Sequence, residues 1–388
     1  MDVQWVLLVG IAASVFVGYN IGGSSTGVTW GPVVGAGLIK KTTAATVMTF
    51  FVFLGGWTVG RNVIDTLAHD IVFEPISLEA GVAILFFIGI GILIANIFGV
   101  PVPTSMTTVA AIVGLGLAEG TLQWDTIGRI FAWWIVTPLI GFWVGAVIGR
   151  YLYPQLDRRF VVKSSAGPLL VRDDTGRFPW LSLGPDTTRH ELFGTITVFV
   201  VACYMAFSAG ASNIPNAVAP LVSEGAIGAN PAIVIATLAI GLGGFTIARR
   251  TMESVGSELT DISLLTAVIV MITAATITTA LSYIGIPISL VMATVMTIVG
   301  LGWGRASRTI TGRDVISGQT DVDIPPMGAL TVDTPEDYAA IGETEPDAVM
   351  EAGKLFDPQA VVRFVSMWII GPSLSLVLAY LFFLTVPL

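Results

Sequence analysis

Residues 204–222 read YMAFSAGASNIPNAVAPLV, an apolar run that a group of Gly, Ser, Asn and Pro residues interrupts. Residues 16–34 read FVGYNIGGSSTGVTWGPVV and align with them without a gap, at an offset of 188 residues. In this alignment Gly22 falls on Gly210. The chain therefore interrupts two long apolar segments with small polar residues at matching places, which predicts a related role for both.

Two further pairs of segments repeat this match in the same order. TVGRNVIDTL at 58–67 falls on TIARRTMESV at 246–255, again at an offset of 188. FGVPVPTSMTTVAAIVGLGLA at 98–118 falls on YIGIPISLVMATVMTIVGLGW at 283–303, at an offset near 186. Three matches in order, at a nearly constant offset, indicate an internal duplication.

The composition is that of a polytopic membrane protein. Of the 388 residues, 54% are hydrophobic and 12% are charged, whereas a soluble domain has about 25% charged residues. A spanning helix needs about 20 apolar residues, and the apolar runs predict roughly eight to twelve spans. One cysteine and two distant histidines exclude a disulfide framework and a metal-ligand cluster. The net charge of −9 disfavours nucleic acid binding.

Two hydrophilic stretches divide the chain. We predict an N-terminal membrane repeat over 1–150, a cytoplasmic linker loop over 151–189, and a C-terminal membrane repeat over 190–388. The second repeat contains a hydrophilic, acidic loop at 305–360. The location is therefore predicted as the cell membrane, with multiple passes.

Charge bias between the halves predicts their orientation. Lys40 and Lys41 follow the first interrupted segment, whereas the corresponding stretch 223–229 contains no base. Conversely, 67–79 has no Lys or Arg, while its counterpart begins at Arg249. Basic short loops face the cytoplasm, so the halves are expected in opposite senses. This predicts an all-α polytopic membrane protein with two inverted-topology repeats and broken or re-entrant helices, the architecture of secondary transporters with a site near the midplane.

Four stretches are predicted breaks within the membrane. They are GGSSTG (22–27), GASNIPN (210–216), GVPVPTS (99–105) and GIPIS (285–289). A break leaves free N–H groups at a half-helix N-terminus, which favours an anion. The predicted substrate-binding residues are Ser24, Ser25, Thr26, Thr104, Ser105, Ser212, Asn213, Asn216 and Ser289. The alternative is that such small residues only allow close helix packing.

At these residues the chain resembles the inorganic phosphate transporter family, the sodium- or proton-coupled phosphate permeases that include sulfate permease relatives. Its first duplicated signature, G-A-N-D-x-x-N-x-x-G-T/P, matches 22–37 and 210–221. Its second, P-V-S-T-S/T-H, matches 101–106 and 287–292. A further element resembles RRTMESVG at 249–256. The resemblance covers both halves.

The chain departs from these signatures at the groups that carry charge. The Asn-Asp pair that the resemblance implies for cation coordination is Ser24-Ser25 in one copy and Ser212-Asn213 in the other. The histidines of the second signature are Met106 and Met292. Any cation coupling is therefore expected to rest on Ser25, Asn213 and Asn216, with Na⁺ or H⁺ as the coupling ion and no other cofactor.

The resemblance implies a secondary active transporter of inorganic phosphate, an ion-coupled symporter that works by alternating access and forms a homodimer in the lipid bilayer. A site without carboxylates makes sulfate or another oxyanion an alternative substrate. Because the ion-binding carboxylates are absent, a second alternative is a membrane sensor or partner-binding protein that does not transport. An enzyme is not expected, because the apolar segments contain no nucleophile–base pair and no carboxylate pair.

Two groups of residues near the ends of apolar segments have alternative interpretations. Asp65 and Glu253 occupy equivalent positions in the repeats and are candidate gate or coupling acids. The alternative for them is pairing with an arginine one turn away, such as Arg61 or Arg249. Tryptophans, Trp134 and Trp368 among them, are interpreted as part of an interfacial belt.

Overall fold

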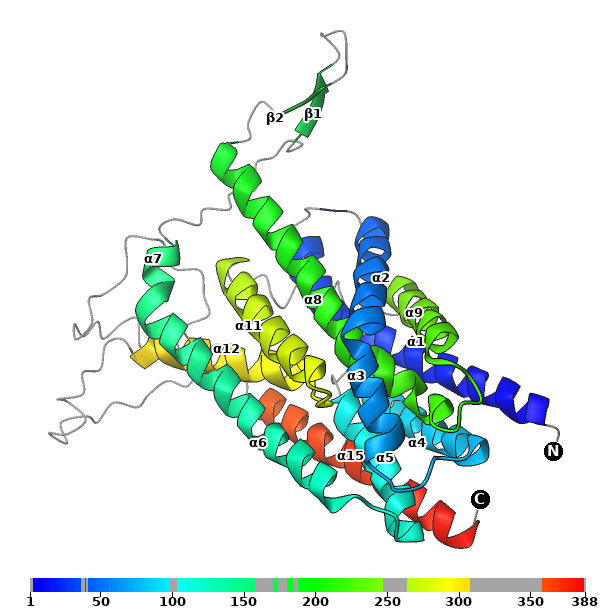
Figure 1. Cartoon of the computed structure of the whole chain (residues 1–388). Helices are drawn as coiled ribbons and strands as arrows, with labels where there is room; N and C mark the ends of the chain where they lie inside the picture. The colour runs from blue at the N-terminus through cyan, green and yellow to red at the C-terminus, as the bar shows by residue number, and fades with distance from the viewer. Residues whose placement is uncertain are drawn as a thin grey trace, which may run out of the picture.

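The computed structural model describes residues 3–35, 39, 41–97, 103–157, 170–173, 180–183, 188–246, 264–307 and 358–386. The predicted all-α class is confirmed: long helices cross one another in a single bundle, and a small β-hairpin projects from it (Figure 1). Helix formation follows from the apolar composition, because a backbone in hydrocarbon must satisfy its hydrogen bonds within its own segment.

The elements before the hairpin are, in chain order, α1 (Val3–Gly35), α2 (Lys41–Thr58), α3 (Gly60–Asp65), the π-helix η1 (Thr66–Asp70), α4 (Leu78–Ile97), α5 (Thr104–Glu119), α6 (Trp124–Val147), the π-helix η2 (Ile148–Leu152) and α7 (Tyr153–Asp157). The chain bends by 59° between α2 and α3. It then runs from α6 through η2 into α7 without interruption.

The hairpin pairs β1 (Leu170–Asp173) with β2 (Trp180–Leu183) in antiparallel register, Leu170 opposite Leu183. It lies within the predicted linker at 151–189. The helices that follow are α8 (Arg189–Val222), α9 (Ala229–Thr246), α11 (Leu264–Tyr283), α12 (Leu290–Ala306) and α15 (Pro358–Thr385). Thr188 caps α8, because its side chain accepts a hydrogen bond from the N–H of Glu191 at 3.2 Å.

Seven of the described helices are long and apolar enough to cross a membrane, and the bent pair formed by α2 with α3–η1 makes an eighth. The chain is therefore a multi-pass membrane protein, at the lower end of the eight to twelve spans predicted from the sequence. Helices α5 and α12 are shorter apolar helices. Each begins at one of the predicted breaks, α5 after Pro103 and α12 after Ser289.

The prediction of a break at the other two stretches is wrong. Helix α1 continues through 22–27 and α8 continues through 210–216. The glycines serve close packing instead: a Cβ on Gly22 would collide with the backbone carbonyl of Ile240, and one on Gly210 with that of Val52. Small residues allow membrane helices to approach this closely. No half-helix N-terminus is therefore available at either stretch.

The glycine contacts are reciprocal between the two halves. Val52 and Ile240 are themselves related by the offset of 188, as Gly22 and Gly210 are. Gly55 of α2 likewise lies against the carbonyl of Phe207, and its equivalent, Gly243 of α9, lies against that of Tyr19. Each half therefore supplies the same surface to the other.

The packing of whole helices shows the same reciprocal relation between the two halves. Helix α1 packs against α9 as α2 packs against α8, and α5 packs against α15 as α6 packs against α12. The last pair reveals a further repeat, WIVTP at 134–138 in α6 and WIIGP at 368–372 in α15. Its offset is 234, because residues 307–357 separate α12 from α15. The opposite membrane orientation of the halves stays a prediction.

Gly210→Ala is expected to lower the free energy of unfolding, because the new methyl group would collide with a backbone carbonyl, which cannot change rotamer as a side chain can. Overpacking of this kind costs about 1–3 kcal/mol. Gly128→Ala in α6 is the matched control, since a Cβ at this residue would meet nothing within 4 Å, and the exchange should be neutral or slightly stabilising. Thermal unfolding of both variants in detergent measures the difference. Equal melting temperatures would contradict the packing role of Gly210.

Candidate functional site

Three polar side chains lie in the C-terminal half of α8, at the stretch where a break was predicted. Ser212, Asn213 and Asn216 are all buried, and Asn216 is 0% exposed. Ser212 and Asn216 are four residues apart and therefore share one face of the helix. Pro215, inside α8, has no N–H to donate, so the carbonyl of Ala211 lacks the usual helical bond. The helix thus presents side-chain and backbone polar groups without unwinding.

The N-terminus of α5 supplies the second part of the site. Pro103 precedes the helix, and the first described helical bond of this turn runs from the N–H of Thr107 to the carbonyl of Pro103 at 3.1 Å. The N–H groups of the first turn therefore have no partner within the helix. The side chains of Thr104 and Ser105, on this first turn, are buried. A helix N-terminus inside the protein favours negative charge.

Hydrogen bonds join these two elements. The hydroxyl of Thr104 donates to Oδ1 of Asn213 at 2.8 Å. Nδ2 of Asn216 lies 3.3 Å from Oγ1 of Thr104 and 3.1 Å from Oγ of Ser105. It also donates to the backbone carbonyl of Ser212 at 3.0 Å. The amides of α8 and the hydroxyls of α5 thus form one buried network.

The segment that leads into α12 closes the network from a third side. Ser105 donates its hydroxyl proton to the carbonyl of Ile288 at 2.9 Å. The next residue, Ser289, caps α12 and accepts a hydrogen bond from the N–H of Met292 at 3.3 Å. The turn into this segment uses Gly285 at φ +77°. We call the five side chains Thr104, Ser105, Ser212, Asn213 and Asn216, with the backbone of Ile288 and Ser289, the polar cluster.

The polar cluster contains no charged side chain among the residues that the structure describes. Its hydroxyl, amide and helix N-terminal N–H groups are donors suited to an oxyanion. One strong acceptor is left over: Oδ1 of Asn216 is buried and has no hydrogen-bond partner in the described structure. An unpaired buried acceptor costs free energy. A protonated oxygen of a ligand, or a cation, would satisfy it.

The structure does not describe the side chains of most of the remaining predicted residues. Ser24, Ser25 and Thr26 lie on α1, but their side chains are outside the described residues, as is Glu253. Asp65 is exposed at the end of α3. In the described structure Arg61 forms no ion pair with it and instead donates to the carbonyl of Trp57 at 2.6 Å and to Asn230 at 2.7 Å.

Two asparagines that the sequence interpretation missed form an amide pair one turn before Ser24. Nδ2 of Asn96, on α4, lies 3.2 Å from Oδ1 of Asn20 and 3.1 Å from its carbonyl oxygen. Asn20 is buried. Both are isolated amides within apolar runs, and this was the signal that could have found them.

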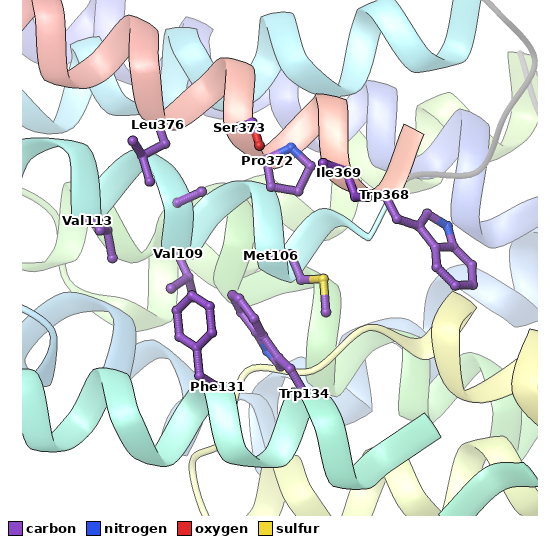
Figure 2. A pocket seen from close by; sticks show the side chains of 11 residues that line it. Met106, Val109, Val113, Phe131, Trp134, Trp368, Ile369, Pro372, Ser373 and Leu376 are labelled. Carbon is purple, nitrogen blue, oxygen red and sulfur yellow. The ribbon is translucent and has the colours of Figure 1, made fainter. Parts of the chain in front are cut away.

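An apolar cavity of about 220 Å³ lies beside the start of α5, between α5, α6 and α15. Figure 2 shows Met106, Phe131, Trp134 and Trp368 around it. Met106 occupies the position of the family's histidine. It contributes sulfur and methylene surface to this cavity and not a polar group to the cluster.

Comparisons with known proteins agree with this architecture. The chain is 27% identical over 311 residues to a sulfate permease of Bacillus subtilis, covering 80% of each chain. It is 25% identical over 377 residues to a protein of Pyrococcus furiosus named as a phosphate permease, covering 80% of this chain and 90% of the relative. A solved structure titled as the sodium-dependent phosphate transporter shares the fold, with a TM-score of 0.64, 18% identity, and coverage of 98% of this chain and 100% of that one.

The family model described as the phosphate transporter family matches residues 21–379. This range runs from α1 to α15 and contains every described part of the polar cluster. Family and fold together point to a transporter. The chain therefore belongs to the phosphate transporter family.

Proposed function

We propose that this protein carries inorganic phosphate across the membrane as an ion-coupled symporter that works by alternating access, with the polar cluster as its anion site. The observation that carries the proposal is the meeting of the α5 N-terminus, the α8 amides and the segment before α12 in one buried network. The first-turn N–H groups of α5 lack partners within the helix and would bind the anion directly. The hydroxyl protons of Thr104 and Ser105, which are donated to Asn213 and Ile288 in this structure, would turn toward the anion when it binds.

The unpartnered Oδ1 of Asn216 favours phosphate over sulfate as the substrate. Phosphate near neutral pH carries at least one proton, which an acceptor in the site can bind. Sulfate carries none, and a site that contacts it would leave this acceptor unpaired. The lack of a carboxylate among the described residues of the cluster and the sulfate permease relative keep sulfate as the second candidate.

The coupling ion would use the oxygen atoms of the same region. Na⁺ would find Oδ1 of Asn213, the carbonyl of Ala211 that Pro215 leaves without its helical bond, and the hydroxyl oxygens of Thr104 and Ser105. These are neutral ligands, so a bound anion would have to supply the compensating charge. We therefore expect the cation to bind weakly unless the anion is present, which is the linkage that symport requires.

Alternating access would use the reciprocal packing of the two halves. The polar cluster combines elements of both, α5 from the first half with α8 and the start of α12 from the second. A rocking of one half against the other about the glycine contacts would open the cluster to either side in turn. The homodimer implied by the resemblance stays a prediction.

Uptake of labelled phosphate and labelled sulfate into proteoliposomes tests this function. Each anion is offered with an inward Na⁺ gradient, with an inward proton gradient, and with neither. We expect phosphate uptake, stimulated by one of the two gradients. Uptake of sulfate without uptake of phosphate would show that sulfate is the substrate. Phosphate uptake that neither gradient stimulates would contradict symport. Flux of neither anion would overturn the proposed transport.

A further inference from the structure

Trp134 contacts the segment that brings Ile288 and Ser289 to the polar cluster. Its indole N–H donates to the carbonyl of Pro287 at 2.9 Å. This carbonyl immediately precedes Ile288, whose own carbonyl accepts the hydrogen bond from Ser105. The segment is thus held between two side chains, Trp134 of α6 on one side and Ser105 of α5 on the other.

Apolar packing reinforces the hydrogen bond. Leu281, Ile286 and Ile288 form a small buried cluster of their own, and Trp134 packs against it. The ring of Trp134 also lies 4.9 Å from that of Phe131, centroid to centroid. Trp134 also lines the apolar cavity, as Figure 2 shows. Trp134 therefore has hydrogen-bond and packing partners inside the protein, and its interpretation as part of an interfacial belt stays a prediction.

The repeat-equivalent tryptophan provides an internal comparison. Trp368 occupies the same place in WIIGP of α15 that Trp134 occupies in WIVTP of α6, and it lines the same cavity. Its indole nitrogen is buried but has no hydrogen-bond partner in the described part of the chain. Among the described residues, Trp134 thus holds a backbone segment and the equivalent Trp368 does not.

We propose that Trp134 is a positioning residue for the anion site: its indole N–H fixes the segment from Gly285 to Ser289, and through Ile288 and Ser105 this segment fixes the hydroxyls of the polar cluster. The role of the site rests on the proposed function; the hold on the segment does not. A small displacement of positioning groups is enough to weaken a preorganised site.

The test compares Trp134→Phe with Trp368→Phe. Both exchanges keep an aromatic ring at the cavity and remove one indole N–H. In proteoliposomes, Trp134→Phe should raise the KM for phosphate by roughly three- to tenfold, the range set by one neutral hydrogen bond, with a smaller change in the maximal rate. Trp368→Phe should leave the KM within about twofold of the unsubstituted protein. An unchanged KM in Trp134→Phe, or an equal rise in both variants, would overturn the proposal.

A measurement without substrate separates this proposal from the proposed function. Amide hydrogen exchange of the purified protein in detergent reports on residues 281–292 directly. Trp134→Phe should accelerate exchange there, while Trp368→Phe should not. If the unsubstituted protein transports neither anion, the proposed function fails, and the exchange rates still decide whether Trp134 holds the segment. Unchanged exchange in Trp134→Phe would show that it does not.

Discussion

Asn216→Leu is expected to abolish phosphate uptake in a protein that still folds and inserts. Among the described residues, this amide contacts the hydroxyls of Thr104 and Ser105 through Nδ2 while leaving Oδ1 free for a ligand. Leu has a similar volume but can offer neither a donor nor an acceptor. The exchange removes the one bond that Oδ1 would make to the ligand and also the amide that positions the two hydroxyls. One bond to a charged ligand is worth about 1.5–3 kcal/mol, which alone corresponds to a ten- to hundredfold loss of affinity.

The fold should survive this change because the hydroxyls around Asn216 keep other partners. Thr104 still donates to Asn213, and Ser105 still donates to the carbonyl of Ile288. Thr278→Val on α11 is the matched control. Thr278 is 0% exposed and its hydroxyl has no partner among the described residues, so the exchange removes a buried polar atom that forms no hydrogen bond to the cluster. Uptake should be unchanged in this control.

Uptake into proteoliposomes, normalised to inserted protein, measures both variants. Size-exclusion profiles and melting temperatures in detergent check that each variant is folded. If Asn216→Leu transports phosphate as the unsubstituted protein does, the anion site lies elsewhere. If the control loses uptake to the same extent, the loss reflects the loss of a buried polar atom and not the loss of a ligand.

The sequence was sufficient to predict the membrane class, the duplication and the convergence of three of the four interrupted stretches. Pro103 and Ser289 precede helix starts, and Asn213 and Asn216 meet the first of these starts. The prediction was wrong where glycine and serine occur inside α1 and α8. A run of small residues is compatible both with unwound backbone and with close packing. Only the partner helix decides, and the partner of Gly210 is the carbonyl of Val52.

Most of the site contacts that the sequence could not predict are hydrogen bonds to backbone carbonyls. The carbonyls of Pro287 and Ile288 accept the bonds from Trp134 and Ser105, and every residue has such a carbonyl. Nothing in the residue types around them marks these two. The role of Trp134 could not be predicted either, because Trp134 and Trp368 lie in similar local sequences and differ in whether the indole N–H has a hydrogen-bond partner among the described residues. Side-chain patterns therefore predicted which residues gather, and the fold determined how they are held.

Asn213→Asp is expected to weaken phosphate binding in the absence of Na⁺ and to make uptake strongly dependent on it. The exchange introduces, at residue 213, the carboxylate that the family signature has in its Asn-Asp pair. The geometry should be retained, because the hydroxyl of Thr104 can donate to a carboxylate oxygen as it does to Oδ1 of the amide. What changes is one negative charge beside an anion site.

The size of the effect follows from Coulomb's law. Two like charges about 8 Å apart at an effective dielectric constant of about 20 repel by about 2 kcal/mol, which corresponds to a roughly thirtyfold loss of affinity. A bound Na⁺ would cancel this repulsion, and a carboxylate is also a better ligand for it than an amide. Phosphate affinity should therefore recover as the Na⁺ concentration rises.

Asn213→Ala separates the charge from the loss of the amide. It removes the acceptor for Thr104 without adding a charge, so its affinity for phosphate should fall and Na⁺ should not restore it. The measurement is the KM for phosphate at a series of Na⁺ concentrations, with K⁺ or choline keeping the ionic strength constant because salt screens charge. A similar KM for the Asp and Ala variants at every Na⁺ concentration would contradict a cation position beside residue 213. If Na⁺ restores phosphate affinity in the Asp variant but not in the Ala variant, the coupling ion and the anion bind in the same cluster. The neutral amide of residue 213 would then weaken sodium coupling because it lacks the negative charge, while the cation site itself is retained.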